Sequence, residues 1–155
     1  ADVVRLIKGD RYRSRLISKI MFGTYNKHIK NVRTVNDWLT RDEAVVDEYN
    51  AGKLTTFLFT VNGYRGLMNM ILYVRKPRNI ERIPKNLPML MISGLDDPVG
   101  EYGKGVYRAY NSYHGHIDDI DLRLYEDCRH ELCNELNKEE IYEEIYGWIM
   151  NHMSK

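Results

Sequence analysis

Cysteine is scarce in this chain, and long apolar runs are absent. The two cysteines, Cys128 and Cys133, are too few and too close together for a disulfide framework. We therefore expect free thiols and a reducing, cytoplasmic location. No apolar run reaches the length of about eighteen residues that a membrane helix needs, and the N-terminus lacks the basic-then-apolar order of a secretory signal. Stable membrane insertion is therefore not expected.

An excess of one charge is also absent. The 23 Lys and Arg residues nearly balance the 22 Asp and Glu residues, which leaves a formal net charge of +1. This balance supplies no general attraction to nucleic acid or to an anionic membrane, so neither is an expected partner. With 43% apolar and 29% charged residues, the composition is that of one ordinary globular domain and not of a disordered chain.

Repeats and low-complexity tracts are lacking too, so local patterns must indicate the organisation. Three stretches in residues 1–85 place apolar side chains at helical spacing: 13–22, 40–49 and 60–74. Thr40 and Glu43 match a capping box, and Thr60 matches a helix N-cap. We therefore expect a helical region up to residue 85. Residues 75–88 carry three of the four prolines and several charges, which predicts a connection.

The pattern changes in residues 86–155. The run LPMLMISG, at 87–94, is short and continuously apolar, as in a strand of a parallel sheet that is covered on both faces. Residues 100–115 have helical spacing, residues 119–127 alternate as a strand does, and residues 137–153 form an amphipathic terminal helix. The order strand, helix, strand, helix predicts a right-handed βαβ crossover and therefore an α/β fold.

Two polar side chains follow the two predicted strands. Asp97 comes after the first strand and His130 after the second. Because the carboxyl ends of parallel strands meet at one edge of a sheet, we expect these residues to lie together. Pro98 favours an extended conformation before it, so the strand is expected to continue through Asp97. An aspartate beside a histidine fixes the imidazole tautomer and leaves the second ring nitrogen to take a proton from a nucleophile.

These residues also carry a family resemblance. The strings ISGLDDPVG and EDCRHELCNE resemble the closing acid and histidine motifs of the α/β-hydrolase fold, most closely those of bacterial lysophospholipase or monoacylglycerol-lipase-like serine hydrolases. MFGTYNKHI, TVNDWLTRDEAVVDEY and FLFTVNGYRGL resemble the helical cap of the same group, so the resemblance spans most of the chain.

The resemblance implies the fold, the site and the substrate class. The chain would be the C-terminal part of an α/β-hydrolase fold, with a helical cap at 1–85 and the last parallel strands and helices of the core at 86–155. Asp97 would be the triad acid and His130 the triad base. The implied substrate is a small-molecule acyl ester, such as a lysophospholipid or a monoacylglycerol, and the implied reaction needs no cofactor.

The nucleophile of that family is missing. It normally lies in a G-x-S-x-G motif before the acid, and no such motif occurs here. None of the five serines is a credible substitute: Ser14, Ser18, Ser93, Ser112 and Ser154. The chain also lacks an initiator methionine, so we expect an excised or processed piece. Its expected partner is the N-terminal half of the same hydrolase, which would carry the nucleophile, and tight self-association into a homo-oligomer is the alternative.

Other chemistry is less well supported. Cys128, His130 and Cys133 could ligate zinc, but no second Cys or His pair completes a tetrahedral site. Residues 100–105, GEYGKG, lack the terminal Gly-Lys-Ser/Thr of a phosphate loop. Glu131 and Glu135 are expected to cap or solvate the loop around His130.

Two alternatives remain open at this point. The apolar stretch with Phe57, Phe59, Tyr64, Met68 and Met70 could be core packing or could line an acyl-chain tunnel. The chain could also be a non-catalytic binding module, or part of a hydrolase that cleaves a peptide or thioester, because fold and triad permit many acyl groups.

Overall fold

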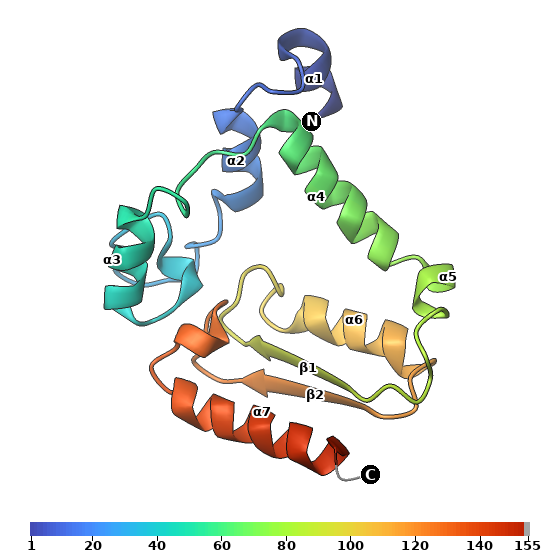
Figure 1. Cartoon of the computed structure of the whole chain (residues 1–155). Helices are drawn as coiled ribbons and strands as arrows, with labels where there is room; N and C mark the ends of the chain where they lie inside the picture. Colours follow the sequence, from blue (N-terminus) through green and yellow to red (C-terminus); the bar gives the residue numbers. More distant parts are fainter. Residues whose placement is uncertain (154–155) are drawn as a thin grey trace.

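A computed structural model of the chain describes residues 1–153 and is shown in Figure 1. The elements follow in the order α1 (Asp2–Lys8), α2 (Arg15–Phe22), η1 (Asp37–Leu39), α3 (Glu43–Ala51), α4 (Val61–Val74), α5 (Pro77–Ile80), β1 (Met89–Gly94), α6 (Lys104–His114), β2 (Ile120–Tyr125), η2 (Leu132–Asn134) and α7 (Lys138–Met153). The prefix η marks a 3-10 helix. The helical region therefore precedes a strand-helix-strand-helix unit, as the patterns predict.

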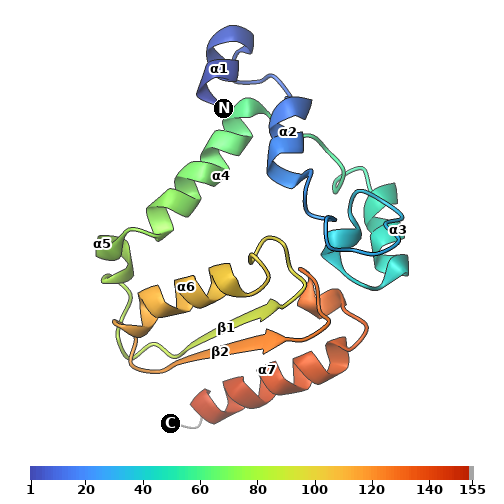
Figure 2. The ribbon, with the colours of Figure 1, turned by 180° about the vertical axis from the view of Figure 1, so that it is seen from behind.

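The sheet of the described residues has two parallel strands. Met89 pairs with Ile120, and the register continues to Gly94 opposite Tyr125. Helix α6 connects the strands, and α6 and α7 lie on opposite sides of them in both views (Figures 1 and 2). The continuous apolar character of β1 follows from this arrangement, because both of its faces meet a helix. The predicted parallel pairing is confirmed.

The core beneath α7 is small. Cys128, Leu132 and Ile141 are buried together. Burying a side chain such as Ile141 stabilises the fold by about 2 kcal/mol. Three partly buried side chains pack against this cluster: Ile92, Tyr125 and Ile145. This core therefore packs α7 and the loop after β2 against the sheet.

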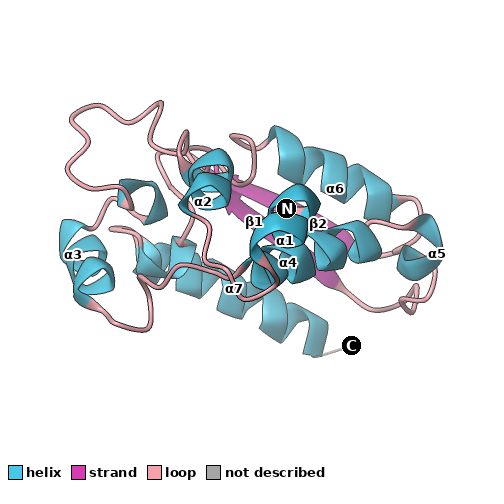
Figure 3. Cartoon of the chain, turned by 90° about the horizontal axis from the view of Figure 1, so that it is seen from above, coloured by secondary structure: helices cyan, strands magenta, loops and turns pink. Residues whose placement is uncertain are grey.

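The helical region has a core of its own. Ile17, Val61 and Tyr64 are buried together, so α2 and the start of α4 pack against each other. Ser14 accepts a hydrogen bond from the amide of Ile17 and caps α2. Thr60 accepts from an amide in the first turn of α4, which confirms the predicted N-cap there. Helix α2 leads toward α3, whereas α4 runs to α5 and the start of β1 (Figures 1 and 3).

Two local predictions are wrong, and a third is incomplete. The N-cap of α3 is Asp42, which accepts from the amides of Ala44 and Val45, whereas Thr40 uses its hydroxyl to bond the carbonyl of Asn134. Residues 75–88 do connect α4 to β1, but the connection contains the short helix α5, which was not predicted and which begins at a proline because that position needs no amide hydrogen. Strand β1 ends at Gly94 and does not continue through Asp97, because the chain turns at residues 95–96.

Candidate active site

Asp97 and His130 meet at the C-terminal edge of the two strands. Nδ1 of His130 lies 3.1 Å from Oδ2 of Asp97. Asp97 is buried in the loop after β1, whereas the His130 side chain is 37% exposed in the loop after β2. The structure therefore brings the two predicted site residues together, although 33 positions separate them along the chain.

The loop after β1 orients the carboxylate. The amide of Asp97 donates to the carbonyl of Gly94, and its own carbonyl accepts from the amide of Tyr102. Oδ1 of Asp97 accepts from the amide of Val99 at 2.8 Å. These bonds occupy one carboxylate oxygen with the local backbone and leave Oδ2 for His130.

Gly94 allows the two loops to approach. A Cβ at this position would lie within 3.0 Å of the carbonyl oxygens of Cys128 and Arg129. Just beyond it, the amide of Leu95 donates to Tyr125 and the amide of Asp96 donates to the carbonyl of Cys128, at 2.9 Å. The end of β1 and the loop after β2 are thus joined through their backbones, which fixes the distance between the acid and the histidine.

An aromatic cluster covers the imidazole from the helical region. The Trp38 ring lies 5.1 Å from the His130 ring, centroid to centroid. Tyr25 meets Trp38 edge to face at 4.9 Å, and Phe22 stacks on Trp38 at 6.5 Å. Such pairs favour offset or edge-on contacts and are worth about 1 kcal/mol each beyond their burial. Neither spacing nor periodicity indicates this cluster, because its members come from α2, from the turn after α2 and from η1.

The carboxylate sets the protonation of the histidine. A carboxylate oxygen only accepts, so Nδ1 of the neutral ring carries the hydrogen and Nε2 has the free lone pair. The hydrogen bond to Asp97 raises the pKa of His130, against the opposing effect of burial, and the charge of Glu131 adds to the increase. Burial and the same aspartate raise the pKa of Tyr25. Asp97 can therefore stabilise the imidazolium that forms when Nε2 of His130 takes up a proton.

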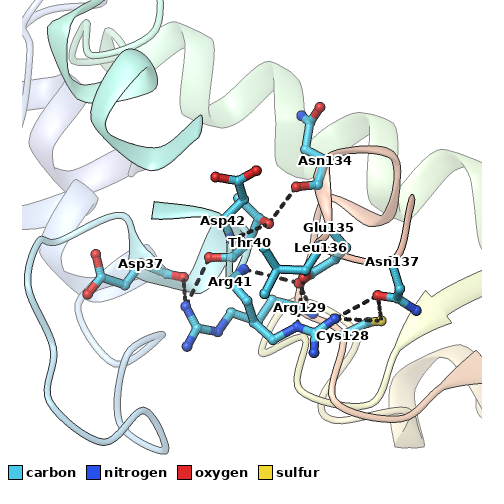
Figure 4. A network of polar contacts seen from close by, with 10 residues as sticks. All are labelled: Asp37, Thr40, Arg41, Asp42, Cys128, Arg129, Asn134, Glu135, Leu136 and Asn137. Atoms are coloured by element: carbon cyan, nitrogen blue, oxygen red, sulfur yellow. Dashed lines mark hydrogen bonds and ion pairs between the residues drawn. The ribbon is translucent and has the colours of Figure 1, made fainter. Parts of the chain in front are cut away.

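Figure 4 shows a network of polar contacts around Glu135, which follows His130 in the loop after β2. Glu135 is completely buried and accepts from Nε of Arg41 and from the amide of Arg129, both at 2.8 Å. The expectation that Glu135 caps or solvates the loop is therefore wrong in part, because its partner Arg41 lies 94 residues away along the chain. Glu131 does bond locally, to the side-chain amide of Asn134. An ion pair between distant segments leaves no periodic signal in a sequence.

The alternative zinc set is not assembled in residues 1–153. Cys128 is buried and its Sγ faces Asn137, whereas Cys133 is exposed and His130 is engaged with Asp97. The group of possible ligands that the described part of the chain does hold is elsewhere: Asp119, Asp121 and His152. There His152 Nε2 lies 3.2 Å from Asp119, and Trp148 donates to Asp121.

Three serine hydroxyls make local hydrogen bonds in the described residues. Ser14 caps α2, Ser93 is buried and donates to the Gly94 carbonyl, and Ser112 donates to the Arg108 carbonyl. Ser18 lies on α2, and Ser154 lies outside the described residues.

The apolar stretch in the helical region is divided. Tyr64 is 1% exposed and belongs to the core, which confirms core packing for this residue. The other four side chains are exposed: Phe57, Phe59, Met68 and Met70. For those four, an acyl-chain tunnel stays a prediction. In the described part of the chain, no helix is long and apolar enough to cross a membrane.

Comparison with known proteins found one matching family model and several similar solved structures. The family model of the serine aminopeptidases, S33, matches residues 6–137. No curated protein gave a match. Among solved structures, a highly thermostable carboxyl esterase from Bacillus coagulans in complex with glycerol has 21% identity and a TM-score of 0.82, and the alignment covers 99% of this chain and 49% of the esterase.

Two further solved structures are similar. A lipase in its open form has 18% identity and a TM-score of 0.85, over 99% of this chain and 50% of the lipase. A soluble variant of monoglyceride lipase from Saccharomyces cerevisiae, in complex with a substrate analogue, has 16% identity and a TM-score of 0.59, over 97% and 49%. The chain spans about half the length of the structures it matches, and at these identities the likeness shows the fold alone.

The topology agrees with these comparisons. Two parallel strands, with helices on both sides and a helical region before them, form a partial α/β-hydrolase fold, so the expected fold class is confirmed. The family model covers most of the chain, including the loops that carry Asp97 and His130. The chain therefore belongs to the serine aminopeptidase S33 family of α/β hydrolases.

Proposed function

We propose that this chain is the C-terminal portion of a serine hydrolase that cleaves carboxylic esters. The observation that carries the proposal is the 3.1 Å contact between Asp97 and His130 at the carboxyl edge of parallel strands. A buried acid that holds one imidazole nitrogen, on a histidine side chain that is 37% exposed, is the geometry of a catalytic triad without its nucleophile.

Each residue then has one role. Nε2 of His130 removes the proton from a serine hydroxyl as that oxygen attacks the acyl carbon, and later returns the proton to the leaving alcohol. Asp97 keeps the ring in the Nδ1–H tautomer and stabilises the imidazolium that forms. Trp38 limits the motion of the ring from the side of the helical region.

The nucleophile would come from an N-terminal half of the same hydrolase. Strand β1 pairs only with β2 within residues 1–153, so its second edge presents unpaired backbone groups. A further parallel strand would satisfy these groups, and two strands alone are too few for independent stability. Self-association of this chain is the other way to cover that edge, and intact masses under denaturing conditions distinguish the two, since they show one kind of polypeptide or two.

We propose a lipid-like ester, such as a lysophospholipid or monoacylglycerol, as the substrate. The exposed apolar side chains at residues 57–70 support this choice, since apolar walls suit an acyl chain. A second candidate is a peptide substrate, which is favoured by the description of the family as serine aminopeptidases. Nothing in the acid–histidine pair distinguishes these acyl groups.

The proposal is tested by labelling the purified protein with a fluorophosphonate and measuring intact masses under denaturing conditions. We expect a second polypeptide to co-purify and to carry one label, which this chain lacks. Labelling should fall strongly in Asp97→Asn and His130→Ala, since removal of a triad member costs several orders of magnitude in rate. A single unlabelled monomeric chain would refute the proposal, and unchanged partner binding in both variants would favour a non-catalytic module.

Substrate choice is tested on the labelled assembly. We expect p-nitrophenyl esters of medium acyl length to be hydrolysed at least tenfold faster, by kcat/KM, than aminoacyl p-nitroanilides, a difference of about 1.4 kcal/mol in transition-state binding. The reverse order would favour the peptide substrate.

A further inference from the structure

The backbone around His130 is fixed at three consecutive positions. The amide of Arg129 donates to Oε1 of Glu135 at 2.8 Å. The amide of His130 donates to the carbonyl of Trp38 at 3.4 Å, and the amide of Glu131 donates to the carbonyl of Leu39 at 2.7 Å. The conformation of this short stretch therefore depends on groups that lie outside it.

The guanidinium of Arg129 completes the connection. Its Nη1 donates to the carbonyl of Asp37 at 2.7 Å and to the carbonyl of Thr40 at 2.9 Å. Together with the amide bonds, all four carbonyls of residues 37–40 accept hydrogen bonds from residues 129–131. The sequence separation across these contacts is about 90 residues, so they join η1 of the helical region to the histidine loop.

Glu135 is the charged centre of these contacts (Figure 4). Besides the Arg129 amide, it accepts from the amide of Arg41 at 3.3 Å and from Nε of Arg41 at 2.8 Å. Nη2 of Arg41 continues to Oδ1 of Asn137, at 2.6 Å. Residues 37–41 and 128–137 thus form one polar unit, which we call the clamp. The carboxylate of Glu135 is completely buried, and the partners named here all belong to this chain.

The burial of Glu135 restricts the positions that its hydrogen-bond partners can take. A buried charge needs its full set of partners, since the loss of one partner leaves the charge uncompensated away from water. The Glu135 carboxylate therefore tolerates only a narrow range of positions for the Arg129 amide, which is one residue from His130. The ring then has little freedom to move away from Asp97, and Trp38, whose carbonyl belongs to the clamp, contacts the same ring.

We propose that Glu135 and Arg129 are positioning residues for His130: they hold the loop against residues 37–41 so that Nδ1 faces Asp97. The role of His130 as a base rests on the proposed function. The positioning of its ring by Glu135 and Arg129 is argued from the structure alone. Glu135 and Arg129 touch no reacting atom, and they act only through the backbone of the histidine loop.

The experiment follows the His130 ring by NMR in the purified protein, with its complementary half where one co-purifies. Two quantities are measured, the midpoint of the His130 titration and the share of the Nδ1–H tautomer from nitrogen shifts above that midpoint. Asp97→Asn gives the values for a ring without its acid. We expect Glu135→Gln to move both quantities most of the way toward those values.

A second variant separates geometry from charge. Arg129→Lys keeps the positive charge, but the lysine side chain ends one bond short of Nη1, the nitrogen that donates to both carbonyls. This variant also serves if Glu135→Gln does not fold. We expect the same direction of change in both variants. Asp97 and Glu131, the carboxylates that act on the ring, are unaltered in both, so a change in the ring reports a change in its position. The matched control is Ile80→Val, which loosens a buried position in α5 away from the clamp and should leave the ring unchanged.

The outcomes separate the two proposals. If Glu135→Gln and Arg129→Lys lower the melting temperature while the His130 titration and tautomer stay as in the wild type, the residues are merely structural and the inference is wrong. The inference also fails if Ile80→Val shifts the ring to the same extent. If the wild type takes no fluorophosphonate label but the ring responds as expected, the positioning stands and the hydrolase proposal fails.

Discussion

Replacing Gly94 by alanine tests how closely the two site loops approach. The new Cβ would lie within 3.0 Å of the carbonyl oxygens of Cys128 and Arg129, so the backbones must separate by roughly 1 Å. Overpacking of this kind costs about 2 kcal/mol, and weakening the bond from the Asp96 amide to Cys128 adds about 1 kcal/mol. We expect the free energy of unfolding to fall by about 3 kcal/mol, or about 10 °C in Tm for a chain of this size.

The assay is equilibrium urea unfolding followed by tryptophan fluorescence, with the rate of fluorophosphonate labelling as the functional measure. Labelling should slow, because the displaced loop carries His130 away from Asp97. Gly66→Ala is the matched control, since a Cβ there meets nothing within 4 Å and the position lies inside α4. That variant should stabilise the protein by up to about 1 kcal/mol. If Gly94→Ala is no less stable than Gly66→Ala, the close approach is not real.

Three further outcomes follow from the site and its neighbours. In the assembled hydrolase, kcat/KM should rise with pH through a midpoint above the ordinary histidine value of 6.5, and Asp97→Asn should lower that midpoint along with the rate. Because the folded-state pKa of His130 is raised, its contribution to stability is complete below its unfolded value and declines as the pH rises through the folded value. The difference in urea midpoint between the wild type and Asp97→Asn should therefore be largest near about pH 6 and shrink toward about pH 9. Asp42→Ala should lower the free energy of unfolding, measured in urea, by about 1 kcal/mol, because α3 loses its N-cap. The rate of labelling should change little. If Thr40 were the N-cap of α3, the substitution would cause no such loss.

The strands and the acid–histidine pair could be predicted because their signals are local. The continuous apolar run that ends at Gly94 and the alternation after residue 119 determine two strands, and a βαβ unit brings their ends together. The side-chain hydroxyl of Thr60 gives a similarly local cap signal. Thr40 misled the prediction, because its hydroxyl bonds a carbonyl 94 residues away and not its own helix.

The remainder of the site could not be predicted because its partners are distant in sequence. Nothing near Glu135 distinguishes it from Glu131, yet one is completely buried and the other bonds a neighbouring asparagine. Its burial is decided by Arg41, which belongs to another segment. The position of Trp38 over His130 depends on the same long-range packing. Periodicity reports which face of an element is apolar, and it carries no information about ion pairs between elements.

The clamp also bears on the order in which this chain can fold. Asp97 and His130 are 33 residues apart, whereas Arg41 and Glu135 are 94 apart. Closing the longer loop costs about 1 kcal/mol more in chain entropy, and contacts of such long range form slowly. The β1–α6–β2 unit can therefore collapse with its acid and histidine close together while the loop amides are still bonded to water. The final geometry of the site is then acquired only when the N-terminal third of the chain arrives.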